Sequence, residues 1–179
     1  MTTQVSPGEQ YPKISMSQTE QIALALGSNL GDSLTILPQA LTHLVEKYGL
    51  HLLTHSHWYR TPPLGPPQPD FINGCALLAM THSPTDLLQI LLATEADFGR
   101  IRKGKWQPRT LDLDIIFYGN ERIHTPQLTI PHPEYHRRAF VLLPLAEIAP
   151  DWCDPQTGVT VKALAQQVDG SGIMMVGAI

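Results

Sequence analysis

Apolar and polar residues along this chain follow two periods, one typical of strands and one typical of helices. Alternating apolar positions predict a strand over residues 21–26, and further strands are predicted over 50–59, 72–81 and 111–117. Apolar residues recur at helical spacing at positions 34, 37, 41, 44, 45 and 48. Pro38 fits this helix if it begins near Thr35, which leaves the proline in the first turn, and Gly49 ends it.

A second helix has clear signals at both ends. Ser83 is the predicted N-cap, Pro84 takes the first position, Asp86 adds an acid to the first turn, and Gly99 ends the helix. Shorter helical stretches are predicted over 140–148, interrupted at Pro144, and over 161–168. This order of elements predicts an α+β sandwich, a mostly antiparallel sheet with helices packed on its faces.

The length of 179 residues suits one domain. We expect a disordered leader at 1–18, a single domain at 19–169 and a flexible tail at 170–179, because the ends are rich in small and polar residues. The chain contains neither a GxxxxGK[ST] nor a GxGxxG motif, so any nucleotide has to be bound by side chains.

The composition of the chain indicates where the protein is expected to work and which kind of ligand it binds. Hydrophobic content of 42% and charged content of 16% are those of a globular protein, and no apolar run is long enough to span a membrane. No signal peptide is visible and two cysteines make no disulfide scaffold, so the cytoplasm is the expected location. The net charge of −4 argues against nucleic-acid binding. Five of the 12 Lys and Arg residues lie between Arg100 and Arg109, which favours a small polyanionic ligand.

Two acids follow this basic segment. Asp112 and Asp114 are two residues apart on a predicted strand, so both carboxylates point to one face, while Leu111, Leu113, Ile115 and Phe117 point to the other. Paired carboxylates next to cationic residues suit Mg²⁺ and the phosphates it binds. The segment therefore predicts Mg²⁺-dependent phosphoryl chemistry.

Five motifs occur in a recognisable order. They are ALGSNLGD at 25–32, YRTPPLG at 59–65, DFIN at 70–73, GRIRK with W.PRTLDLDII at 99–116, and PHP with RRAFVLLPL at 131–145. Together they resemble the 6-hydroxymethyl-7,8-dihydropterin pyrophosphokinase family of folate biosynthesis, over roughly residues 22–150. The resemblance implies a ferredoxin-like fold and transfer of pyrophosphate from the co-substrate ATP to the hydroxymethyl group of the pterin, with release of AMP.

The resemblance also implies roles for single residues. Asp112 and Asp114 would bind two Mg²⁺ ions, and Arg100 and Arg109 would be catalytic on a mobile loop, with Arg102 adding to phosphate binding. The pterin ring would stack between two aromatic residues, hydrogen-bond an Asn and lie against a rigid loop; these residues are Phe71, Phe140, Asn73, Thr61, Pro62 and Leu64. Besides the three arginines, the implied ATP-binding residues are Glu95, Trp106, Ile115, Thr129, His132 and Arg138.

Two rival readings remain. A two-metal nuclease or phosphatase would use the same aspartates but would need a further carboxylate and no aromatic sandwich. A non-catalytic RNA- or nucleotide-binding module would show exposed aromatics on a basic sheet and would not depend on Mg²⁺. We expect ATP and the pterin as small-molecule partners of a monomer, with neither nucleic acid nor membrane involved.

Overall fold

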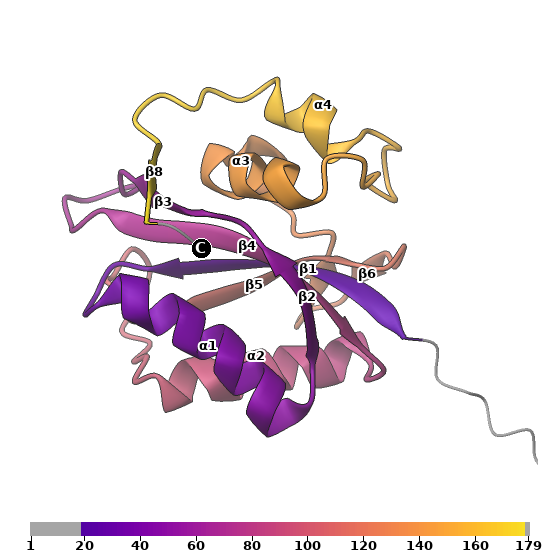
Figure 1. Cartoon of the computed structure of the whole chain (residues 1–179), viewed down its shortest axis with the longest axis horizontal. Coiled ribbons are helices and arrows are strands. Elements are labelled where there is room, and N and C mark those ends of the chain that lie inside the picture. Colours follow the sequence, from indigo (N-terminus) through magenta and orange to yellow (C-terminus); the bar gives the residue numbers. More distant parts are fainter. Residues whose placement is uncertain (1–18, 178–179) are drawn as a thin grey trace, which may run out of the picture.

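The computed structural model describes residues 19–177, so the predicted leader lies outside the described residues. Its centre is a six-stranded antiparallel sheet in the order β5-β1-β4-β3-β8, with β2 also paired to β4 (Figure 1). The strands are β1 (Glu20–Ser28), β2 (His51–His55), β3 (Trp58–Thr61), β4 (Phe71–Met80), β5 (Asp112–Tyr118) and β8 (Met174–Val176), and β6 (Ile123–His124) and β7 (Thr129–Ile130) form a small second sheet.

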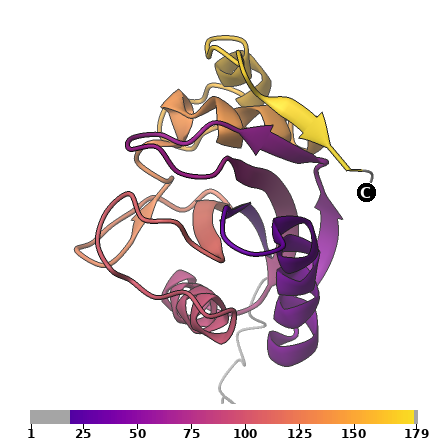
Figure 2. The same cartoon turned by 90° about the vertical axis from the view of Figure 1, so that its left-hand side faces the viewer.

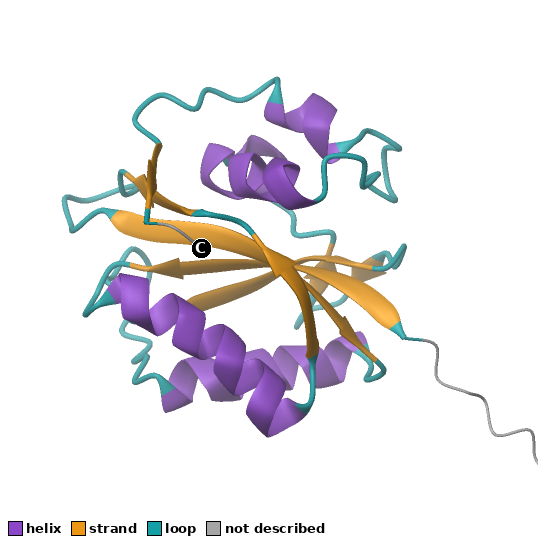
Figure 3. Ribbon diagram, viewed as in Figure 1, coloured by secondary structure: helices purple, strands orange, loops and turns teal. Residues whose placement is uncertain are grey.

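Helices cover both faces of the sheet. α1 (Ser33–Tyr48) and α2 (Pro84–Asp97) lie on one face, and α3 (Ala139–Ile148) and α4 (Val161–Ala165) lie on the other (Figures 1 and 3). A short 3₁₀ helix, Tyr135–Arg137, precedes α3. Each interface holds its own core of buried apolar side chains, centred on Leu24, Leu37 and Leu91 on the first face and on Phe117, Leu142 and Leu145 on the second. The expected α+β ferredoxin-like sandwich is confirmed.

The helix signals near Ser83 are also confirmed, whereas those of the first helix need a correction. The Ser83 side chain accepts the backbone N–H of Asp86 at 3.1 Å and caps α2. α1 begins at Ser33, two residues earlier than predicted, because Gly31 turns the chain at a φ of 83° and the Asp32 carbonyl accepts the Ile36 N–H. Pro38 therefore lies in the second turn, and Pro144 lies within α3 without ending it.

The strand predicted over 50–59 is wrong as a single element. It is split into β2 and β3 at Ser56 and His57. The Ser56 hydroxyl accepts the Cys75 N–H at 2.9 Å and donates to the His57 carbonyl at 2.7 Å, so a side chain replaces part of the ladder.

The prediction that Phe117 points to the same face of the sheet as Leu113 and Ile115 is wrong, because β5 contains a β-bulge. Ala23 pairs with Phe117 while Leu24 pairs with Ile115, so Ile116 is the extra residue. The bulge turns Phe117 to the α3 side of the sheet, where its ring stacks on Trp152 with centroids 5.3 Å apart. The carbonyl of Ile116 accepts the His132 N–H at 3.1 Å, which brings the segment before α3 close to β5.

The end of the described chain also contributes to the sheet. Within the segment expected to be a flexible tail, Met174–Val176 form β8, which pairs with β3. Over residues 19–177, no helix has the length and apolar character needed to cross a membrane.

Candidate active site

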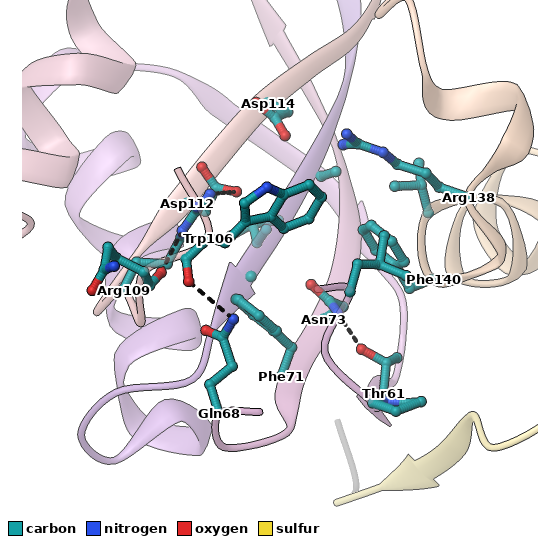
Figure 4. Close-up of a pocket in the computed structure, with 17 residues that line it drawn as sticks. Thr61, Gln68, Phe71, Asn73, Trp106, Arg109, Asp112, Asp114, Arg138 and Phe140 are labelled. Carbon is teal, nitrogen blue, oxygen red and sulfur yellow. Dashed lines mark hydrogen bonds and ion pairs between the residues drawn. The ribbon is translucent and has the colours of Figure 1, made fainter. Parts of the chain in front are cut away.

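One pocket collects side chains from both halves of the sequence. Its volume is about 730 Å³ including its open mouth. The walls come from β1, the end of β3, β4, β5, the start of α3 and two loops, which are the 62–70 loop after β3 and the basic 98–111 loop after α2 (Figure 4). The backbone of both loops can be followed in Figure 2. The lining residues are Ala25, Leu26, Gly27, Thr61, Pro62, Leu64, Gln68, Phe71, Asn73, Trp106, Gln107, Arg109, Asp112, Asp114, Arg138, Phe140 and Val141.

One end of this pocket is lined by the rings of Phe71 and Phe140 and by the side-chain amide of Asn73. All six residues expected to bind a pterin line it. Asn73 lies between Phe71 and Phe140 in the view of Figure 4, and its Nδ2 donates to Thr61 Oγ1 at 2.7 Å. Gly27 faces this amide so closely that a Cβ there would lie 2.6 Å from Asn73 Oδ1. The amide is therefore held in one orientation beside a slot with aromatic side chains.

The other end of the pocket is charged. Asp112 pairs with Arg100 through its Oδ1 at 2.6 Å and with Arg109 through its Oδ2 at 3.1 Å. Burial in the pocket and the neighbouring charge of Asp112 raise the pKa of Asp114 to about 7. The Arg138 guanidinium lies 5.6 Å above the Phe140 ring, at the boundary between the two ends.

The two aspartates fit a hard divalent cation. Their carboxylates are oxygen ligands on one face of β5. Burial, and after it the charge of Asp112, raises the pKa of Asp114, and a bound cation would balance the two negative charges. Within residues 19–177 no cluster of three or more His, Cys, Asp and Glu side chains could hold a metal ion. An ion at Asp112 and Asp114 therefore has to take its other ligands from water and from a bound substrate.

Glu95 anchors the basic loop from behind. Its side chain is only 4% exposed and pairs with Arg100 at 2.8 Å and Arg102 at 2.9 Å. It also accepts the Leu113 N–H at 2.8 Å. Burial raises the pKa of Glu95. Burial by itself would lower the pKa of Arg100, but the charges of its neighbours Asp112 and Glu95 outweigh burial, so the pKa of Arg100 is raised. This ion-pair cluster joins α2, the basic loop and β5.

The remaining predicted ATP-binding residues lie outside the pocket. Arg100 and Arg102 line a neighbouring hollow that shares Arg109 and Gln107 with it. Ile115 is 5% exposed and packs in the core under α1 and α2, and Thr129 lies on β7. His132 Nε2 is 3.9 Å from Asp114 Oδ2, and burial followed by the charge of Arg138 lowers the pKa of His132 to about 4.

Some functional candidates were not identified from the sequence. Gln68 lines the pocket and its Nε2 donates to the Trp106 carbonyl at 3.2 Å. Asn29, which the sequence showed only as part of the motif at 25–32, makes contacts with both pocket loops. Its position two residues after Gly27 in a recognised motif was the available signal, whereas nothing local distinguishes Gln68.

The fold and the pocket together define a class of protein. A slot with aromatic walls suits a flat ring, and the adjoining carboxylates and arginines suit a metal-bound polyphosphate. An α+β sandwich that places both within one cavity favours the class of phosphoryl-transferring enzymes.

Comparison with known proteins makes the class specific. The chain belongs to the 7,8-dihydro-6-hydroxymethylpterin-pyrophosphokinase family, whose model matches residues 23–150. It is 51% identical over 156 residues to a 2-amino-4-hydroxy-6-hydroxymethyldihydropteridine pyrophosphokinase of Synechocystis, covering 87% of this chain and 80% of the relative. The protein of the same name from Haemophilus influenzae is 43% identical over 147 residues, covering 82% of this chain and 92% of the relative.

Solved structures agree on the fold. Wild-type HPPK-DHPS of Plasmodium falciparum superposes with a TM-score of 0.66 at 16% identity, and the match covers 86% of this chain. The chain spans 42% of the length of that protein. At this identity the likeness concerns the fold alone.

Proposed function

We propose that the pocket binds a hydroxymethyl dihydropterin at its aromatic end and the triphosphate of ATP at its charged end, and that the two react where the ends meet. The reaction is transfer of pyrophosphate to hydroxymethyldihydropterin in folate biosynthesis, with ATP as the co-substrate. The observation that carries the proposal is the joining of an oriented amide, two phenylalanines and a carboxylate–arginine cluster in one cavity.

The pterin half of the proposal rests on Asn73 and its support. The pterin ring is flat and carries donors and acceptors at its edge, so it needs stacking partners and a directional hydrogen bond. Phe71 and Phe140 supply the rings, and the Thr61 hydroxyl fixes the Asn73 amide. Pro62 and Leu64 close the side of the slot on a loop with little freedom.

The phosphate half rests on charge. An oxygen nucleophile that approaches the β-phosphorus meets several negative charges, and guanidinium groups stabilise the charge that shifts during transfer. Arg109 and Arg100 pair with Asp112 beside the proposed triphosphate end, and Glu95 pairs with Arg100 and Arg102. Closure of the basic loop would exclude water, which competes with the pterin hydroxyl.

We also infer a dependence on two Mg²⁺ ions at Asp112 and Asp114. When bound, the ions neutralise phosphate charge and align the acceptor with the leaving AMP. Asp112 and Asp114 would hold them from the same face of β5. Arg138, whose guanidinium lies 5.6 Å above the Phe140 ring, would bind ATP where the two ends meet. The proposed setting is the cytoplasm, and the proposed state is a monomer.

A two-metal nuclease or phosphatase is the weaker reading. It needs a further protein carboxylate at the metals, and residues 19–177 contain no cluster with one. The aromatic slot beside the aspartates has no use in such an enzyme.

Calorimetry with 6-hydroxymethylpterin tests the division of the pocket. We expect one site per chain and a loss of affinity of at least tenfold in Phe140→Ala, because the ring loses one stacking face. Leu164→Ala is the control, since this residue on α4 packs against the same core as Phe140 without lining the pocket. Equal affinity in Phe140→Ala and the unmodified chain would refute the assigned pterin end.

A further inference from the structure

Glu147 lies near the end of α3 and joins this helix to β3. Its Oε1 accepts the His57 backbone N–H at 2.9 Å and lies 2.5 Å from His57 Nδ1. Its Oε2 accepts the Tyr59 hydroxyl at 2.6 Å. Burial, and after it the bond to Glu147, raises the pKa of Tyr59, so the phenol keeps the proton that it donates. All three residues lie outside the lining of the pocket.

Side chains fasten α3 to the sheet at both ends of the helix. α3 packs over β4 and β3 (Figure 1). Near its start, the Cys75 thiol donates to the Val141 carbonyl at 3.5 Å. A thiol is a weak donor, whereas hydrogen bonds to a carboxylate are about twice as strong as those between neutral groups. Glu147 therefore contributes more than Cys75 to the position of α3 on the sheet.

The strand that Glu147 binds leads directly to the pterin end. Tyr59 is paired with Asn73 of β4, and Thr61 is paired with Phe71. Tyr59 and Thr61 are two positions apart on β3, so both side chains lie on the face of the sheet that α3 covers. The Thr61 hydroxyl accepts the Asn73 amide. The phenol that binds Glu147 thus belongs to the residue opposite the amide that would orient the pterin.

The helix carries the other wall of the same slot. Phe140 lies in the first turn of α3, and Glu147 follows it by about two turns, or roughly 10 Å along the helix axis. Figure 4 shows Asn73 between Phe71 and Phe140. The gap between Phe140 on the helix and Asn73 on the strand depends on where α3 lies above the sheet. A bond that holds α3 against β3 therefore also holds this gap.

We propose that Glu147 is a positioning residue that sets the width of the pterin slot by holding α3 against β3. The inference rests on the proposed function, because it assumes that the pterin stacks on Phe140. The phosphate end is built differently, since Asp112 lies on β5 and its partners Arg100 and Arg109 lie on the basic loop. Loss of the Glu147 bonds should therefore weaken pterin binding much more than nucleotide binding.

Calorimetry measures the two ends separately. The affinity of 6-hydroxymethylpterin is determined with saturating Mg²⁺ and α,β-methylene-ATP, and the affinity of the nucleotide is determined without the pterin. Glu147→Ala should weaken pterin binding at least about tenfold, because Phe140 loses its stacking distance, and nucleotide binding by less than about threefold. Tyr59→Phe keeps the ring and removes one of the bonds, so it should weaken pterin binding about threefold.

A conservative variant and a matched control separate positioning from general support of the fold. Glu147→Gln should bind the pterin with an affinity between those of Glu147→Ala and the unmodified chain, because an amide can still accept the His57 N–H and donate to the Tyr59 oxygen. Thr160→Ala is the control. The Thr160 hydroxyl accepts the Ala163 N–H at 3.2 Å and caps α4, on the same side of the sheet as α3. Its loss should leave both affinities unchanged.

Unchanged pterin affinity in Glu147→Ala overturns the inference, and so does an equal loss of pterin and nucleotide affinity, which marks a residue that only supports the fold. If Glu147→Ala fails to fold, Tyr59→Phe decides the question by the same two affinities. Failure of the unmodified chain to bind the pterin overturns the proposed function, and the inference with it. Normal binding by the unmodified chain and by every variant overturns the role of Glu147 alone.

Discussion

The contact between Gly27 and Asn73 gives the sharpest quantitative prediction. Gly27 lies on β1 with an ordinary strand backbone, so Gly27→Ala introduces no backbone strain and gains about 0.5–1 kcal/mol from reduced chain entropy. The new methyl group, however, would lie 2.6 Å from Asn73 Oδ1 and 3.8 Å from the Phe71 ring. The Asn73 amide has to move by several tenths of an ångström.

The movement of the Asn73 amide should weaken pterin binding more than it lowers the stability of the fold. Asn73 is buried and bonded to Thr61, so its displacement costs either this bond or the bond to the pterin edge. One hydrogen bond of about 1.4 kcal/mol corresponds to a tenfold weaker pterin affinity. We therefore expect about a tenfold loss of pterin affinity in Gly27→Ala, with the melting temperature changed by only a few degrees.

A double-mutant cycle isolates the cause. If Gly27→Ala acts through the amide, it should have little further effect in an Asn73→Ala background. Calorimetry and thermal melting of the four proteins give both quantities. A folded Gly27→Ala protein with pterin affinity within twofold of the unmodified chain would falsify the assignment of Asn73 to the ring.

Three more predictions address the charged residues and the ligands. Asp112→Asn should lower turnover at least about 100-fold in a steady-state assay while circular dichroism stays unchanged, and near-normal turnover would contradict the metal assignment. Burial raises the pKa of Glu147, but hydrogen bonds from Tyr59 and His57 outweigh it, so the folded pKa is lowered. The ionised Glu147 therefore stabilises the fold fully above about pH 4.3, and this stabilisation is lost as the pH falls. The free energies of unfolding of the unmodified chain and of Glu147→Gln, measured by chemical denaturation, should differ above about pH 5 and converge toward about pH 3. Finally, Mg²⁺ and α,β-methylene-ATP at about 100 times the dissociation constant should add about 2.7 kcal/mol and raise the melting temperature by roughly 5–10 °C. EDTA should remove most of this shift, and an equal shift with EDTA would argue against bound Mg²⁺.

The features that the sequence predicted well are those that depend on near neighbours. Ser83 caps α2 because the hydroxyl and the Asp86 N–H are three residues apart. Asp112 and Asp114 share a face of β5 because they are two positions apart on a strand, with only Leu113 between them. The six pterin-side residues came from motif resemblance, and the structure brings all of them to one pocket.

The features that were missed depend on contacts between distant segments. The bulge at Ile116 follows from the pairing of β5 with β1 and from the bond between its carbonyl and His132, neither of which local periodicity records. The break at Ser56 likewise depends on Cys75, which lies on another strand. The sequence indicated no separate role for Asn29 because its partners Gln68 and Arg109 are 39 and 80 residues away.

The central claim is that this pocket transfers pyrophosphate, and the identity of the nucleotide product tests it most directly. The protein is incubated with ATP, Mg²⁺ and 6-hydroxymethyl-7,8-dihydropterin, and the nucleotides are separated by chromatography. We predict one AMP for each pterin diphosphate formed, and no AMP when the pterin is left out. ADP as the product, or nucleotide cleavage that does not depend on the pterin, would contradict the account.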